Sequence, residues 1–164
     1  EPMQPPTDRP VPQRASKARA LAQTRGFGVL ATVSKRMPGY PFASVTPYAM
    51  DEHGRPIFLI SQLAVHTKNL NEDPKASLLI FDPAAEQDPL TSARMNLMGE
   101  VRPVPDADLE AVRSFYLQQH PSSEQWLDFG DFGLYRLEIQ DIYYVGGFGE
   151  MGWVSKQDFE KALV

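Results

Sequence analysis

The segment SQLAVHTKNLNEDPKASLLIF, residues 61–81, carries a group of polar side chains of the kind that bind anions. Hydroxyl, imidazole and ammonium groups lie within nine residues at Ser61, His66, Thr67, Lys68 and Asn69. A turn that opens a helix also leaves backbone N–H groups free, and phosphate binds such groups together with a cation. The segment therefore predicts a phosphate site. The alternative is a solvated polar connection in which Asp73 and Pro74 only end the helix.

Two further positions and one aromatic segment are candidates for a binding site. Arg94 begins an alternating pattern in ARMNLMGEV, so its side chain points either inward, where it needs an acceptor, or to a solvated rim. Pro47 lies within a strand pattern and cannot donate to a ladder, which fits a plain edge strand or a surface for a flat ligand. The aromatic residues of YYVGGFGEMGW line a flat-ligand pocket, an oligomer interface or the end of a barrel: Tyr143, Tyr144, Phe148 and Trp153.

Several classes of chemistry lack the residues they need. The chain has no cysteine, which excludes disulfides, thiolate metal sites and a cysteine nucleophile. His53, His66 and His120 are not spaced as zinc ligands, and we expect no metal site. The net charge of −5 predicts no binding to nucleic acid or to membranes. No apolar run approaches the roughly 18 residues that a membrane helix needs.

A mainly β fold with peripheral helices must position these residues. Apolar or alternating segments predict strands at FGVLATVS, FASVTPYAM, IFLIS, KASLLIFDP, ARMNLMGEVRPV and FGLYRLEIQDIYYVGG. Helices are predicted over residues 15–25 and 65–71 and in DADLEAVRSFYLQQHP, SSEQWLDF and VSKQDFEKAL. Short connections between the first strands predict an antiparallel sheet, closed or nearly closed into a barrel. We expect residues 1–13 to form a disordered lead-in and residues 14–164 a single domain.

The order of these segments resembles the FMN-binding split-barrel superfamily, which includes pyridoxamine 5′-phosphate oxidase. The likeness covers about residues 15–155 and is carried by GVLATVS, ASVTPYAMDEHGRPIFLIS, LAVHTKNLNEDPKASLLI, ARMNLMGEV and DIYYVGGFGEMGWV. The tail and the HTKNL element are most similar to haem-utilisation proteins and cellular-repressor glycoproteins. The resemblance implies a six-stranded antiparallel split β-barrel that forms a homodimer with flavin at the subunit interface.

The resemblance further implies an FMN-dependent oxidoreductase whose substrate is unassigned. It puts phosphate contacts at the strand end and turn, ring contacts on the second strand, and one polar contact at the start of a later strand. The cofactor-binding residues implied in this way are Ser44, Val45, Thr46, Pro47, Ser61, Gln62, His66, Lys68 and Arg94. No catalytic residue is assigned.

Departures from the family leave alternatives open. Pyridoxamine 5′-phosphate oxidases hold the substrate phosphate with a C-terminal Arg and His, and neither residue type follows Arg136 here, so that reaction itself is not expected. A non-enzymatic member similar to the cellular-repressor proteins would hold no cofactor. A haem-binding member would use His53, His66 or His120 as its axial ligand, and F420 is a further alternative to FMN. We expect a cytoplasmic protein.

Overall fold

The computed structural model describes residues 11–162, so most of the lead-in predicted at 1–13 lies outside the described residues. The strands are β1 (Phe27–Val33), β2 (Pro41–Pro47), β3 (Ala49–Met50), β4 (Pro56–Ser61), β5 (Lys75–Phe81), β6 (Arg94–Pro103), β7 (Phe132–Gly147) and β8 (Glu150–Val154). The α-helices are α1 (Gln13–Thr24), α2 (Val65–Glu72), α3 (Leu109–Gln119), α4 (Glu124–Leu127) and α5 (Lys156–Lys161). Among the described residues, no helix is both long and apolar enough to cross a membrane.

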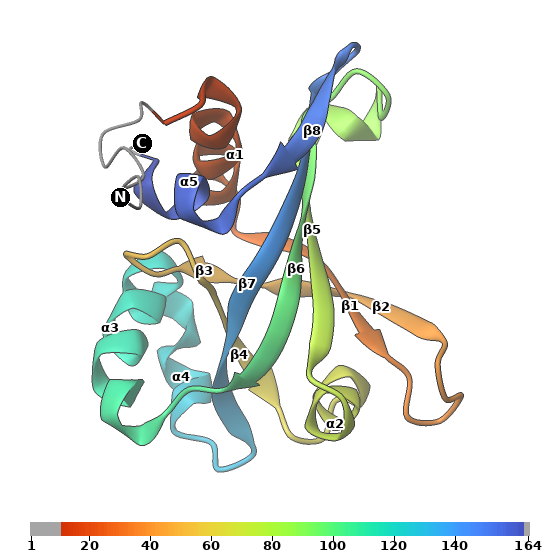
Figure 1. Cartoon of the computed structure of the whole chain (residues 1–164). Coiled ribbons are helices and arrows are strands. Elements are labelled where there is room, and N and C mark those ends of the chain that lie inside the picture. Colours follow the sequence, from red (N-terminus) through yellow and green to blue (C-terminus); the bar gives the residue numbers. More distant parts are fainter. Residues whose placement is uncertain (1–10, 163–164) are drawn as a thin grey trace, which may run out of the picture.

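These strands form one antiparallel sheet that curls into a half-open barrel (Figure 1). Along the sheet the order is β2-β1-β5-β6-β7-β4-β3, and β8 pairs with β7. The predicted antiparallel, mainly β fold is confirmed. The expected number of six strands is too low, because β3 separates from the predicted second strand and β8 forms within the glycine-rich tail.

The core lies on the concave side of the sheet, where alternating residues of neighbouring strands meet. Leu30, Leu78 and Leu97 are fully buried there. Helix α1 packs on this side through Ala18 and Ala22, whose small side chains allow the helix to come close. Helix α2 lies near the opposite end of the strands from α1 (Figure 1).

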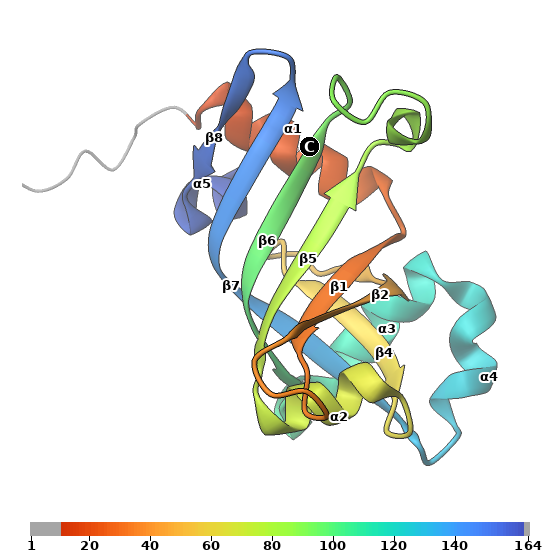
Figure 2. The same ribbon diagram turned by 90° about the vertical axis from the view of Figure 1, so that its right-hand side faces the viewer.

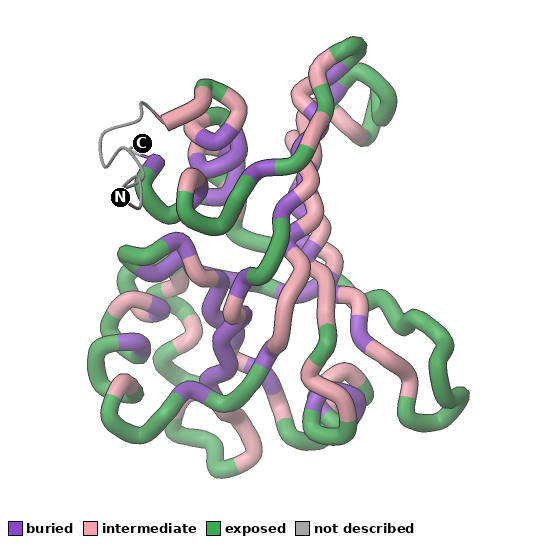
Figure 3. Tube along the Cα trace, in the orientation of Figure 1, coloured by how far each residue is buried: buried purple, intermediate pink, exposed green. Residues whose placement is uncertain are grey.

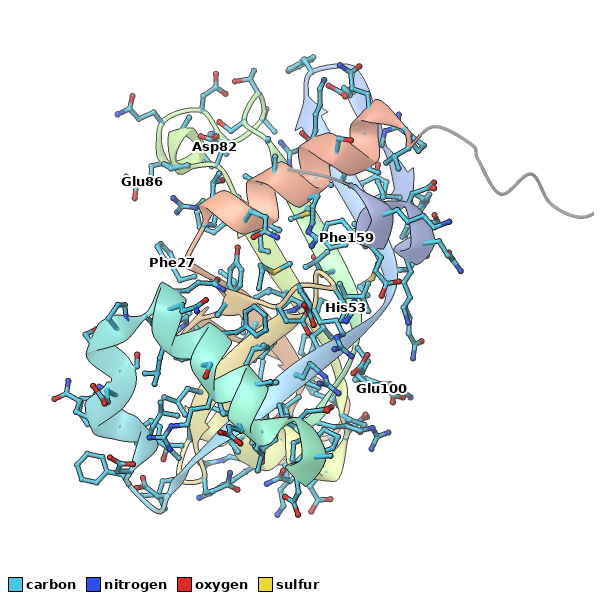
Figure 4. The ribbon with its side chains drawn as sticks, turned by 90° about the vertical axis from the view of Figure 1, so that its left-hand side faces the viewer. Phe27, His53, Asp82, Glu86, Glu100 and Phe159 are labelled. Carbon is cyan, nitrogen blue, oxygen red and sulfur yellow. The ribbon has the colours of Figure 1, made fainter. Side chains whose placement is uncertain are left out.

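A second layer forms where α3 and α4 pack against β4 and β7. Figure 4 shows these two helices in front of the strands. His120, just after α3, donates from Nε2 to the carbonyl of Tyr48 over 2.6 Å. Gln119 bonds both the N–H and the carbonyl of Met50, at 2.9 and 2.8 Å. These bonds attach the end of α3 to the segment that contains β3.

Strand β6 bends at Gly99, where its register against β7 shifts between Met98 and Gly99. A Cβ atom at Gly99 would collide with the carbonyl of Glu138, so the close approach of the two strands requires glycine. The first residues of the 16-residue strand β7, Phe132–Arg136, precede the position opposite this bulge, and they pair with β4. The bulge therefore helps one long strand to join both halves of the barrel.

Candidate functional site

The predicted phosphate turn lies at the junction of β4 and α2, where its side chains bond other parts of the fold. Ser61 Oγ donates to Asp131 Oδ2 over 3.1 Å. Gln62 Nε2 donates to the hydroxyl of Tyr135 over 3.2 Å, and that hydroxyl donates to Asn71 Oδ1 over 2.9 Å. These bonds connect α2 and the end of β4 to the start of β7. The carboxylate of Asp131 beside Ser61 also disfavours an anion at that hydroxyl.

Asn69, in the same turn, is buried and serves the β1–β2 hairpin. Its Oδ1 accepts a bond of 3.0 Å from the backbone N–H of Lys35, and its Nδ2 donates to Thr32 Oγ1 over 3.1 Å. The sequence prediction treated Asn69 as a possible phosphate donor. From the sequence, an asparagine that binds phosphate cannot be distinguished from one that holds the fold together. Only the packing of α2 against β1 shows that Asn69 has the structural role.

His66 and Lys68 are two residues apart on α2, a spacing that points side chains in different directions. Lys68 is exposed, whereas His66 is half-buried with its Nδ1 3.4 Å from Ser44 Oγ. Its Nε2 is buried and has no hydrogen-bond partner among the described residues. Burial lowers the pKa of His66 below its ordinary value, which favours the neutral ring.

Strand β2 divides the four implied ring contacts between its two faces. Thr46 is buried, while Val45 is 71% exposed and Pro47 is exposed as well. Successive side chains of a strand alternate between faces, so the side chains of Ser44 and Thr46 lie opposite those of Val45 and Pro47. Contact between a flavin ring and the backbone of this strand stays a prediction.

Arg94 is half-buried at the start of β6 and holds the loop that precedes it. Its Nη1 donates to the carbonyls of Pro89 and Leu90, at 2.8 and 3.1 Å. A third carbonyl, that of Ser92, lies 3.3 Å away. The role of Arg94 as a cofactor contact remains a prediction, and its bonds here are those of a loop-ordering residue.

A largely apolar surface, here named the outer sheet face, covers the convex side of the sheet. The strand register aligns one residue from each of six strands in a single row: Val45, Val29, Leu79, Asn96, Tyr143 and Trp153. The rings of Tyr143 and Trp153 are in contact at 5.0 Å between centroids, and Trp153 is 61% exposed. Figure 2 views this side of β5, β6 and β7, with α1 behind the strands. A solvated face of an antiparallel sheet is usually polar, so this composition indicates a binding surface.

One end of the outer sheet face is hollowed by a cavity of about 450 Å³. Small residues line it, including Ala31, Ser77 and Gly99. Its charged lining residues are one cation, Lys75, and two anions, Glu100 and Asp141. The volume lies within the range of small-molecule sites. Sequence reasoning missed this surface, although the unbroken apolar run of FGVLATV is typical of a strand covered on both sides.

The three histidines lie away from the outer sheet face. His53 is exposed in the turn between β3 and β4 (Figure 4), with Nε2 3.6 Å from Glu52. His120 is engaged by the carbonyl of Tyr48, and His66 lies against Ser44 on the other side of β2 from Val45. Within residues 11–162, the row across the outer sheet face therefore contains no histidine.

Several known proteins that are similar to this chain are named for haem. The chloroplastic heme oxygenase HOZ of Arabidopsis thaliana is 42% identical over 141 residues, which are 84% of this chain and 43% of HOZ. Heme oxygenase HutZ of Vibrio cholerae is 28% identical over 133 residues, which are 79% of this chain and 74% of HutZ. The structure of a heme binding protein from Mycobacterium smegmatis matches with a TM-score of 0.84 and 34% identity, covering 92% of this chain and 61% of that one.

The chain spans about half the length of the first curated relatives, 43% of HOZ and 57% of human CREG2. The family model described as CREG, beta-barrel, matches residues 9–161. The likeness to the split-barrel superfamily, and to its haem-utilisation and cellular-repressor branch, is therefore confirmed. The chain belongs to the CREG β-barrel family.

Proposed function

We propose that this chain is a haem-binding split-barrel domain related to heme oxygenases. The observation that carries the proposal is its 42% identity, over 84% of the chain, with a protein named a heme oxygenase. The similarity to the heme binding protein of M. smegmatis, at 34% identity over 92% of the chain, also supports it. Haem, which the sequence analysis gave as an alternative cofactor, is therefore our first candidate, and FMN is the second.

The outer sheet face is the surface that suits haem best. A porphyrin needs a flat apolar surface, which Val29, Leu79 and Tyr143 supply in one row. Its carboxylates need a cation, and Lys75 lies beside the cavity at one end of the face. Haem would supply iron redox chemistry, while the chain would orient the ring and exclude water. The row of the outer sheet face fits the porphyrin ring, whereas Glu100 and Asp141 line the same cavity as Lys75 and oppose the haem carboxylates there. The described residues bring no histidine to this face.

The same face supports a homodimer. A largely apolar surface that includes exposed aromatic side chains is typical of interfaces between identical subunits. A second copy on the outer sheet face would cover the side of a bound ring that this chain leaves open. In the homodimer predicted from the sequence, the haem would then lie between the two subunits.

FMN remains a second candidate because of one observation on α2. The side chain of Lys68 is exposed and forms no ion pair among the described residues, so its ammonium is available to a phosphate. An FMN titration therefore belongs beside the haem titration. Saturable binding of FMN, without a shift of the haem Soret band, would favour this candidate instead.

Haem titration followed at the Soret band tests the main proposal. We expect saturation at one haem per chain or per pair of chains. Leu79→Glu should abolish it by placing a carboxylate at the centre of the row, whereas Leu63→Glu, at a residue 73% exposed beside α2, should bind haem as wild type does. Absence of saturable binding, or an equal loss in both variants, would refute the site.

A second step tests turnover. Addition of a chemical reductant and air to the haem complex should bleach the Soret band if the chain degrades haem, as the names of its relatives suggest. A complex that keeps its Soret band under these conditions would limit the proposal to haem binding.

A further inference from the structure

A second cavity, of about 400 Å³, lies between α3, α4 and the strands β4 and β7. We name it the helix-side cavity, because α3 and α4 contribute to its lining. Figure 4 views the molecule from the side that these two helices cover. The outer sheet face is seen from the opposite direction in Figure 2. The apolar lining comes from Leu59, Leu109, Leu127, Phe132 and Leu134.

The cavity exists because α3 packs tightly along only part of its length. Val112 and Tyr116 are buried against the sheet, whereas Leu109, in the first turn, is 36% exposed. Leu59 and Leu134 are paired neighbours on β4 and β7 that line the cavity, where Leu134 is buried and Leu59 only partly buried. The exposed apolar lining is thus available to an apolar ligand.

Two charged residues of α3 lie at the same cavity. Arg113 donates from Nη2 to Asp128 Oδ1 over 3.3 Å, and both side chains of this ion pair are exposed. An exposed pair adds little stability, so the guanidinium can exchange Asp128 for a carboxylate of a ligand. Glu110, one helical turn before Arg113, repels a second negative charge. Arg113 is the one cation among the lining residues of the cavity, so a head group with more than one negative charge is disfavoured.

We propose that the helix-side cavity binds an amphipathic monocarboxylate. Its apolar chain, of roughly eight to twelve carbon atoms by volume, lies between α3, α4 and the two strands. Its carboxylate pairs with Arg113. This site is separate from the proposed haem surface and uses none of its residues.

A tryptophan close to the cavity provides the readout. Trp126 lies 5.8 Å from the cavity residue Phe132 and 5.7 Å from Phe129, measured between ring centroids. The chain has two tryptophans, so Trp153→Phe leaves Trp126 as the single emitter. Titration of this variant with decanoate, below its micelle concentration, should change the emission of Trp126 saturably. An emission that does not saturate overturns the proposal.

Two arginine variants test the head-group contact. Arg113→Gln should weaken decanoate binding about three- to tenfold and leave binding of uncharged decanol unchanged. The matched control is Arg102→Gln, since Arg102 forms a similar exposed pair with Glu100 at 2.8 Å but lies outside the cavity. This control should bind decanoate as the parent does.

Three results would overturn the contact with Arg113. One is an unchanged affinity in Arg113→Gln, and another is an equal loss for decanoate and decanol in that variant. The third is the same loss in Arg102→Gln. Haem titration of Arg113→Gln with both tryptophans present separates this inference from the proposed function, because Arg113 lies outside the outer sheet face and this variant should keep the Soret response of wild type.

Discussion

Asn69 makes two hydrogen bonds from inside α2, and both reach the strand and turn that begin the β1–β2 hairpin. Replacing it by leucine would leave the N–H of Lys35 and the hydroxyl of Thr32 without these partners. We expect Asn69→Leu to lower the free energy of unfolding by about 2–3 kcal/mol, measured by urea denaturation.

The control for this prediction is Asn71→Leu on the exposed side of the same helix. Its side-chain amide donates to Gln62 and accepts from the hydroxyl of Tyr135. Asn71 is exposed, so water can replace the amide in these bonds. A smaller loss is therefore expected. Equal losses in the two variants would show that burial of Asn69 adds nothing.

His66 gives the fold a pH dependence at the residue scale. Burial lowers its pKa in the folded chain below the value of about 6.5 that an unfolded histidine has. The unfolded state therefore binds a proton first as pH falls through that region, and the folded state loses stability relative to it. Stability that is present at pH 7.5 should decline towards pH 5.5.

Urea unfolding at these two pH values measures the effect. His66→Gln should reduce the decline, since glutamine does not titrate, whereas His53→Gln at an exposed turn should leave it unchanged. Figure 3 shows how much of the turns is exposed compared with the strands. The same decline in wild type and His66→Gln would assign the pH dependence to other groups.

At the scale of elements, one buried arginine joins α1 to α5. Arg19 donates to the carbonyls of Phe159, Glu160 and Glu52, at 2.9, 3.3 and 3.3 Å. Its guanidinium also lies over the ring of Phe159 at 5.5 Å, and Figure 4 shows Phe159 close to α1. Gly54 permits this arrangement, since a Cβ there would lie 2.7 Å from Arg19 Nη1.

We expect Arg19→Met to release α5 before the rest of the chain unfolds. The last carbonyls of the helix would lose their donors, at a cost of about 1–3 kcal/mol. Hydrogen exchange should then show faster exchange in residues 156–161 than in β5 and β6. Lys17→Met, which removes only an exposed pair with Glu150, should leave that pattern as in wild type. Unchanged protection of α5 in Arg19→Met would contradict this account.

The positions of most elements could be predicted from local patterns. Residues 65–71 were predicted as helix, and α2 spans Val65–Glu72. Strand β8 was missed because GGFGEMGW has little β propensity, and it forms because β7 offers it a free edge. The segment FGLYRLEIQDIYYVGG was predicted as strand, and in the structure it is the single strand β7.

At the scale of the whole molecule, the outer sheet face could not be predicted from local patterns. Its row joins Val29 to Tyr143, which are more than one hundred residues apart, through the register of four strands. Periodicity tells which residues of one strand share a face, but it does not tell which strands are neighbours. The turn at Ser61 and Lys68 was visible as a polar segment, and its contacts with β1 and β7 were not.

The proposed homodimer makes a prediction at this scale. An interface on the outer sheet face would bury Val45, which is 71% exposed in the single chain. Val45→Glu should then convert the dimer to a monomer, because the new carboxylate would lose its water in the interface without gaining a partner. A typical interface of this kind buries about 800 Å² per subunit. Val65→Glu is the matched control, since Val65 is 52% exposed on α2 and outside that face. Sedimentation equilibrium should give the mass of two chains for wild type and for this control, and of one chain for Val45→Glu. A dimer that survives Val45→Glu would place the interface elsewhere and leave the open side of the haem surface to another partner.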